Sequence, residues 1–160
     1  MAAFTLTSTM PLVGAAWTGT APGLPGTQTV AGTITSTSDL SVYTRNVGVN
    51  LAAATGKTTN MGSGGYETNL TSIKSGTVTF QFNQDFAAAL HVIINTTIGG
   101  LGALAYVDLK ATSAARGAGN PSFVAAFFIT TYTPVMGSTG DVATIDVTWP
   151  LNGAFAFLTA

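Results

Sequence analysis

The chain has 160 residues, a length that suits a single domain. It has no cysteine, which excludes a disulfide framework and a thiolate metal site. Only 7% of its residues are Asp, Glu, Lys or Arg, against about 25% in a typical soluble domain, and the formal net charge is −1.

The scarcity of charge bears on the surface of the folded protein. A monomer of 16.1 kDa exposes about 7,400 Å², which leaves one charge per about 670 Å², against about 190 Å² in an ordinary domain. A lone monomer with so few surface charges associates readily. We therefore expect much of the surface to be covered, either by copies of the same chain or by a membrane.

The first segment, Met1–Ser38, carries no charged residue, and its prolines and glycines exclude a long helix. A disordered tail is one interpretation. Disordered segments are poor in large apolar residues, however, and this one carries several, among them Phe4, Leu6, Leu12, Val13, Trp17 and Leu24. We favour an extended N-terminal arm that orders against a neighbouring subunit, with a short strand at Thr27–Thr35. Met1–Ala16 lacks the basic start and continuous apolar core of a secretory signal.

A single β-rich domain is expected over Asp39–Ala160. Its first strand is Asp39–Leu51. Ala52–Gly65 has the Gly, Thr and Ser content of a long mobile loop. Gly76–Asn83 alternates apolar and polar residues, as a half-buried strand does, with three apolar side chains on one face: Val78, Phe80 and Phe82.

The period then changes from two to that of a helix. Asp85 is a suitable N-cap, and helical spacing follows in Phe86, Leu90, Ile93 and Ile94. We expect one short helix over residues 85–97, stopped by Gly99 and Gly100, and then a strand at Leu104–Thr112.

The same region offers the membrane alternative, because Phe86–Val107 has no charged residue and is long enough to span a bilayer. His91, Asn95 and three glycines interrupt it, and no Lys/Arg-rich flank bounds it. A helix followed by a strand is the better interpretation.

Asn120–Pro150 is predicted to be a hairpin of two strands. Ser122–Thr133 is apolar on both faces in its first half, so both faces should be covered. After a turn, the second strand alternates, with four residues directed inward: Ala143, Ile145, Val147 and Trp149. The other side is polar, and Leu151–Ala160 is a short apolar C-terminal segment. The count of six or seven strands and one helix indicates a mainly β fold, an antiparallel β-sandwich or barrel-like sheet with a flanking helix.

No catalytic, cofactor-binding or metal-ligating residue is predicted. His91 is the only histidine, and no G-x-S-x-G motif supplies a nucleophile, so we interpret His91 as structural. Asp141 and Asp146 are five apart and face opposite sides of a strand, which argues against a carboxylate pair. The five basic residues are dispersed, which excludes a grip on a phosphate backbone but suits a passage through which DNA slides: Arg45, Lys57, Lys74, Lys110 and Arg116.

Three stretches resemble the major tail tube proteins of long-tailed (siphovirus-type) bacteriophages. They are D-L-S-V-Y-T-R-N-V-G-V-N-L (39–51), I-K-S-G-T-V-T-F-Q-F-N-Q-D-F (73–86) and Asn120–Pro150, and the resemblance covers most of Asp39–Ala160. The strand–Gln84–Asp85–Phe86–helix step and the closing G-D-V-A-T-I-D-V-T-W-P are its more specific parts.

The resemblance implies a structural virion protein and no enzymatic activity. Six subunits would close into a ring around a β-lined pore, and rings would stack into a tube that conducts genome DNA. Partners would be a tape-measure protein, a tail terminator and the tail tip proteins, with assembly in the bacterial cytoplasm and no membrane anchor. Two alternatives stay open: another virion β-protein, such as a capsid decoration or coat subunit, and a secreted carbohydrate-binding or hydrolase module.

Overall fold

The computed structural model describes residues 10–22, 31–35, 37–57, 69–84, 89–134, 139–140 and 142–159. Strands dominate this part of the chain, and one short helical segment interrupts them. The strands are β1 (Met10–Gly14), β2 (Trp17–Thr20), β3 (Ala31–Ile34), β4 (Thr37–Asp39), β5 (Thr44–Lys57), β6 (Asn69–Asn83), β7 (Leu104–Lys110), β8 (Ser122–Phe128) and β9 (Thr144–Leu158). The helical segment is α1 (Ala89–Val92), which continues into the π-helical turn η2 (Ile93–Thr97).

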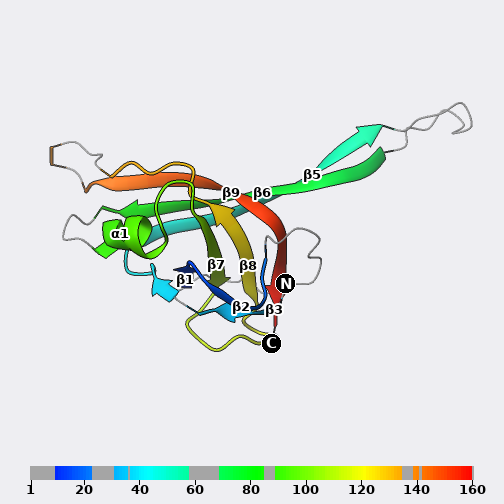
Figure 1. Ribbon diagram of the computed structural model, residues 1–160, viewed down its shortest axis with the longest axis horizontal. Coiled ribbons are helices and arrows are strands. Elements are labelled where there is room, and N and C mark those ends of the chain that lie inside the picture. Colours follow the sequence, from blue (N-terminus) through cyan, green and yellow to red (C-terminus); the bar gives the residue numbers. More distant parts are fainter. Residues whose placement is uncertain are drawn as a thin grey trace, which may run out of the picture.

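Seven strands form one antiparallel sheet in the order β4-β1-β7-β8-β9-β6-β5, and β2 pairs with β3 separately. The long strand β9 belongs to both halves of the large sheet. Its first half, Thr144–Pro150, pairs with β6, and its second half, beginning at Leu151, pairs with β8. The bend in β9 folds the sheet into two layers (Figure 1). The expected fold class, mainly antiparallel β with one short helix, is confirmed.

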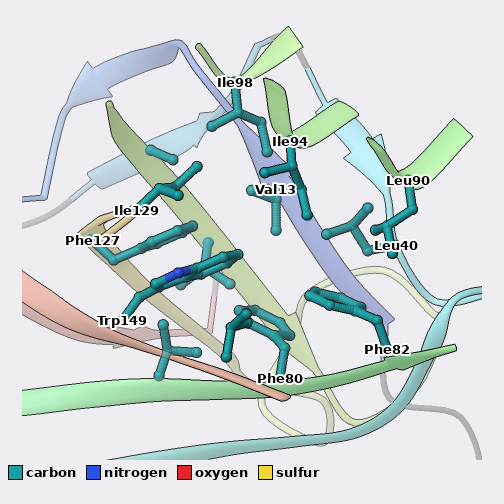
Figure 2. Close-up of a cluster of buried hydrophobic side chains, with 14 of the residues drawn as sticks. Val13, Leu40, Phe80, Phe82, Leu90, Ile94, Ile98, Phe127, Ile129 and Trp149 are labelled. Atoms are coloured by element: carbon teal, nitrogen blue, oxygen red, sulfur yellow. The ribbon is translucent and has the colours of Figure 1, made fainter. Parts of the chain in front are cut away.

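The core lies between these layers. The inward residues of β6 and of the first half of β9 face those of β7 and β8, and the helical segment closes one side (Figure 2). Aromatic rings fill the centre: Phe80 stacks on Phe82 with centroids 5.2 Å apart, and Trp149 lies 5.5 Å from Phe80. Leu90, Ile94 and Ile98 of the helical segment are buried against the same cluster. The prediction that every second residue of β6 and of the first half of β9 points into the core is therefore confirmed.

Strand β8 is buried on both faces, as its apolar sequence predicts. Phe123, Ala125 and Phe127 face the core, while Val124 and Ala126 face the other way and are also buried. That outer side of the layer is covered in part by the β2–β3 hairpin, whose Trp17 contacts Tyr106 of β7 with ring centroids 5.7 Å apart. The strand ends at Phe128, earlier than the expected Thr133.

The N-terminal segment, expected to be a separate extended arm, belongs to the sheet where it is described. Within Met1–Ser38, β1 lies inside the large sheet between β4 and β7, and β2 and β3 form a hairpin on the same chain. Val13 of β1 is fully buried because its register puts it opposite Val107. These residues are thus part of the domain. Residues 1–9 and 23–30 lie outside the described residues.

One other boundary was wrong. Residues 52–57, expected in a mobile loop, continue β5, because Leu51–Lys57 pairs with Gly76–Asn69 of β6 across a bulge. The rest of that expected loop lies outside the described residues. The helical segment expected over residues 85–97 is described from Ala89 and ends at Thr97, as predicted. Its described part is α-helical over Ala89–Val92 and π-helical over Ile93–Thr97. Among the described residues no helix is long and apolar enough to cross a bilayer.

The predicted hairpin of Asn120–Pro150 also pairs differently from expectation. The alternating segment Thr144–Pro150, which was expected to form a hairpin with β8, pairs with β6. Strand β8 pairs instead with Leu151–Leu158, which was expected to be a separate segment. The reason is the bend in β9, where Asn152 and Phe155 pair with adjacent residues of β8 and leave Gly153 and Ala154 in a bulge. Gly153 has a φ of 69°, a conformation that favours glycine.

Candidate functional site

Where β6 pairs with the first half of β9, over Thr77–Asn83, the layer made by β5, β6 and β9 has an outward face without large apolar side chains. Because residues alternate along a strand, burying Val78, Phe80 and Phe82 directs their neighbours outward. We call this surface the polar face. Its side chains are Asn46 and Asn50 of β5, Thr77, Thr79, Gln81 and Asn83 of β6, and Thr144, Asp146 and Thr148 of β9.

The polar face is held in register across three strands. Gln81 lies opposite both Asn46 and Asp146, and Thr79 lies opposite both Gly48 and Thr148. The Thr79 hydroxyl donates to the Gly48 carbonyl at 3.3 Å. A shallow groove of about 220 Å³ runs between these side chains. Asp146 is the only carboxylate among them, so the face offers hydrogen-bonding groups with little charge.

The β5–β6 hairpin extends well beyond the two layers (Figure 1). All residues of Leu51–Lys57 are exposed, and Ile73 of β6 is 73% exposed. Lys57 and Lys74 make this part of the hairpin basic. Two-stranded ribbons of this kind are marginally stable alone.

A second groove lies where the hairpin and β9 separate. The β6–β9 ladder ends at the pair Thr77–Pro150, after which β6 follows β5 and β9 turns toward β8. The space between them, here called the fork groove, measures about 410 Å³. Its lining is Lys74, Ser75, Gly76, Leu151, Gly153, Ala154 and Phe155.

The two described side chains that were weighed for catalysis, His91 and Asp146, lie on separate surfaces. His91 is exposed on α1, with its Nδ1 atom 3.4 Å from the Tyr132 hydroxyl and 3.2 Å from the Asn95 amide nitrogen. Burial raises the pKa of Tyr132 above its ordinary value of 10.0. Asp146 lies on the polar face, and Asp141 lies outside the described residues. Among the described residues, no three His, Asp or Glu side chains are grouped to hold a metal ion.

The glycines after the helical segment act as its stop, as predicted. Gly99 and Gly100 have φ values of 105° and 77°, which only glycine adopts freely, and the Gly100 amide donates to the Ile94 carbonyl at 3.0 Å. A phosphate loop is therefore a poorer description of this turn.

Sequence reasoning missed one polar cluster, on the outer side of β7 and β8. Asp108 is 4% exposed, accepts a hydrogen bond from the Ser122 hydroxyl, and pairs with Arg116 at 3.0 Å. Arg116 also donates to the Gly32 carbonyl of β3 at 3.1 Å. The available signal was a lone Asp within the apolar run Leu104–Leu109. Because Arg116 bonds both Asp108 of β7 and the Gly32 carbonyl of β3, the cluster fixes the β2–β3 hairpin on the sheet.

The basic residues are divided between these surfaces. Arg45, Lys57 and Lys74 lie on the β5–β6 hairpin, Lys110 ends β7, and Arg116 belongs to the buried cluster. No phosphate-binding cluster forms among them.

Comparison with solved structures finds the same fold elsewhere. One match is a chain from a structure described as the virion of a native gene transfer agent particle, with 16% identity and a TM-score of 0.51. The alignment covers 76% of this chain and 88% of that chain. The two chains share a fold. No protein-family model matches the sequence, and no curated protein matches it.

Proposed function

We propose that the protein is a structural component of a virion, and that it is the major tail tube subunit. In this proposal six subunits form a ring, rings stack into a hollow tube, and genome DNA passes through it. The protein then has no enzymatic role. It works through the shape and chemistry of the surfaces that it presents.

The observation that carries this proposal is the polar face. A channel for DNA needs a wall that is wetted but does not hold phosphate, since each Lys or Arg contact to the backbone strengthens binding. The polar face supplies Thr, Asn and Gln side chains, with Asp146 as its carboxylate. A face of this composition permits DNA to slide, and it is our candidate for the lumen lining.

One feature of the sheet, an unpaired edge, favours closure into a ring. β5 forms one end of the seven-strand order and β4 the other, so β5 presents a long edge that no other described strand pairs with. Exposed edges of this length associate unless they are covered. Closing several sheets into one barrel removes the edges.

The likeness in fold to a chain of a gene transfer agent virion agrees with a virion role. The resemblance of residues 39–51, 73–86 and 120–150 to tail tube proteins supplies the finer assignment. The proposed partners follow from it: a tape-measure protein in the lumen during assembly, a terminator and the tail tip proteins at the two ends. The proposed location is the virion tail, after assembly in the host cytoplasm and without a membrane anchor.

Electron microscopy of the purified protein tests this proposal. At high concentration we expect rings or hollow tubes. Closed shells or trimers favour a capsid decoration or coat subunit. A monodisperse monomer that binds an oligosaccharide favours the carbohydrate-binding module. Either of these results would overturn the tail tube assignment.

A further inference from the structure

The turn that precedes β5 presents an exposed apolar side chain on a fixed support. Val42, in the turn Asp39–Tyr43, is 75% exposed, the highest value among the large apolar residues described. The turn around it is closed by the Leu40 carbonyl, which accepts from the amides of Tyr43 at 3.1 Å and Thr44 at 3.0 Å. The Tyr43 carbonyl in turn accepts from the Asn83 amide at 2.7 Å. An apolar side chain held rigidly in solvent is well suited to insertion into a partner, because little entropy is lost on binding.

The fork groove has the complementary form. Gly153 and Ala154 are small residues at its walls, while Leu151 and Phe155 make it apolar. At Gly76 the Leu151 side chain already lies against the backbone. Leu151 and Phe155 are only half-buried, so their apolar surface is open to the groove. A branched aliphatic side chain fits such a lining by size and by polarity.

Charge supports the same pairing. Asp39 is exposed beside Val42, where its Oδ1 atom accepts from the Ser41 amide at 2.8 Å. Lys74 is exposed at the wall of the fork groove. Neither residue forms a salt bridge with another described residue. An interface that joins the turn to the groove places these opposite charges at its rim, where they fix orientation.

The turn and the groove of one chain do not meet each other. β5 runs from Thr44, next to the turn, to Leu51, which pairs with Gly76 at the groove. Eight residues of extended strand span about 26 Å. In Figure 1 the start of β5 lies near α1, at the end opposite the projecting hairpin. Complementary surfaces that lie far apart on one subunit join different copies, and repetition of this head-to-tail contact produces an open filament.

We infer that the Asp39–Tyr43 turn of one copy docks into the fork groove of the next copy, with Val42 in the groove and Asp39 beside Lys74. This inference rests on the proposed function, for which it supplies the contact between successive rings. The interface is heterologous, so it gives the tube a direction.

The absence of native cysteine permits a direct test by cross-linking. Two single variants, Val42→Cys and Ala154→Cys, are purified separately, mixed, and treated with a mild oxidant or a short bifunctional thiol reagent. We expect a covalent dimer in the mixture and little in either variant alone. Thr18→Cys, exposed on β2, replaces Ala154→Cys in the control mixture and should give only background. Equal yields from the two mixtures would overturn the inference.

The charged pair gives a second, independent readout. Added to the Ala154→Cys chain, Lys74→Glu should lower the cross-linking yield about threefold, which is the effect expected from the loss of one exposed ion pair. Asp39→Lys added to the Val42→Cys chain should restore the yield. Arg45→Glu, which changes an exposed charge on the same hairpin, is the matched control and should leave the yield unchanged. A loss that Asp39→Lys does not restore would contradict the Asp39–Lys74 contact.

These outcomes separate the inference from the proposed function. Tubes that form without the Val42–Ala154 cross-link leave the tail tube role standing and overturn the docking. A specific cross-link without tubes supports the docking and overturns the tail tube role.

Discussion

Trp149 and Phe127 stack with their ring centroids 5.1 Å apart and their planes 4° from parallel. Trp149 belongs to the half of β9 that pairs with β6, and Phe127 to the strand that pairs with the other half. The Trp149 indole N–H also donates to the Thr131 carbonyl at 2.7 Å. This stack therefore joins the two layers at the point where β9 bends, and the relative placement of the polar face depends on it.

Removing one ring of this stack should destabilise the fold strongly. Phe127 is fully buried, so Phe127→Ala should lower the free energy of unfolding by about 3–5 kcal/mol, through lost burial and the cavity left behind. Phe127→Asp should abolish folding or assembly, because it buries a carboxylate without a partner. Denaturant unfolding measures the first effect. Phe157→Ala is the control, with an expected cost of about 1 kcal/mol or less, since Phe157 is 66% exposed. Normal tubes from Phe127→Asp would show that β8 is misplaced.

The Asp108–Arg116 pair should matter to stability through its burial. Arg116→Met leaves the Asp108 carboxylate with the Ser122 hydroxyl as its remaining described partner, and should cost about 3 kcal/mol. Replacing both residues, as Asp108→Leu with Arg116→Met, should cost less than the sum of the single changes, because no lone charge stays buried. Thermal unfolding of the three variants completes the cycle. Strictly additive costs would contradict a coupled ion pair.

The raised pKa of Tyr132 predicts a loss of stability at high pH. In the folded protein burial favours the neutral phenol, whereas the unfolded chain ionises at the ordinary value of 10.0. The contribution of Tyr132 to the free energy of unfolding is complete below pH 10.0. It is lost as the pH rises from there through the pKa of Tyr132 in the folded protein. Unfolding midpoints should therefore fall between about pH 9 and pH 12 by more in the wild type than in Tyr132→Phe. Identical profiles would assign the pH effect to other groups.

The composition of the polar face should control DNA affinity. The wild-type tube should not retain DNA at moderate salt, whereas a Thr79→Arg and Thr148→Arg variant should retain it with a strong salt dependence. Filter retention of labelled DNA gives the measurement. Thr18→Arg and Thr33→Arg place the same charge on the exposed β2–β3 hairpin and form the matched control. Equal retention by the two variants would argue that the polar face does not line the lumen.

Local alternation was enough to predict much of the sheet. The inward residues of β6, the double burial of β8 and the inward face at Ile145–Trp149 follow from periodicity, because each depends on neighbours within one strand. The glycine stop after the helical segment is also local, since a positive φ at Gly99 and Gly100 needs no distant partner.

Strand pairing could not be predicted in the same way. The partners of β9 change at Pro150 and Leu151, which depends on a bulge and on the packing of two layers. β1 lies between two other strands of the sheet, although the composition of its segment is like that of a disordered tail. Its position depends on the register that sets the buried Val13 opposite Val107. The fork groove and the Asp108–Arg116 pair arise from the same long-range placement. The spacing of residues along the sequence does not predict which distant strands become neighbours.

The central claim is that copies of this chain build a hollow tube with the polar face toward the channel. Electron cryomicroscopy of assembled protein tests it most directly, because a reconstruction shows which side chains face the channel. The account predicts stacked six-membered rings with Thr79, Gln81 and Asp146 at the channel wall. A monodisperse monomer at high concentration, or a tube with these three residues on its outside, would contradict it.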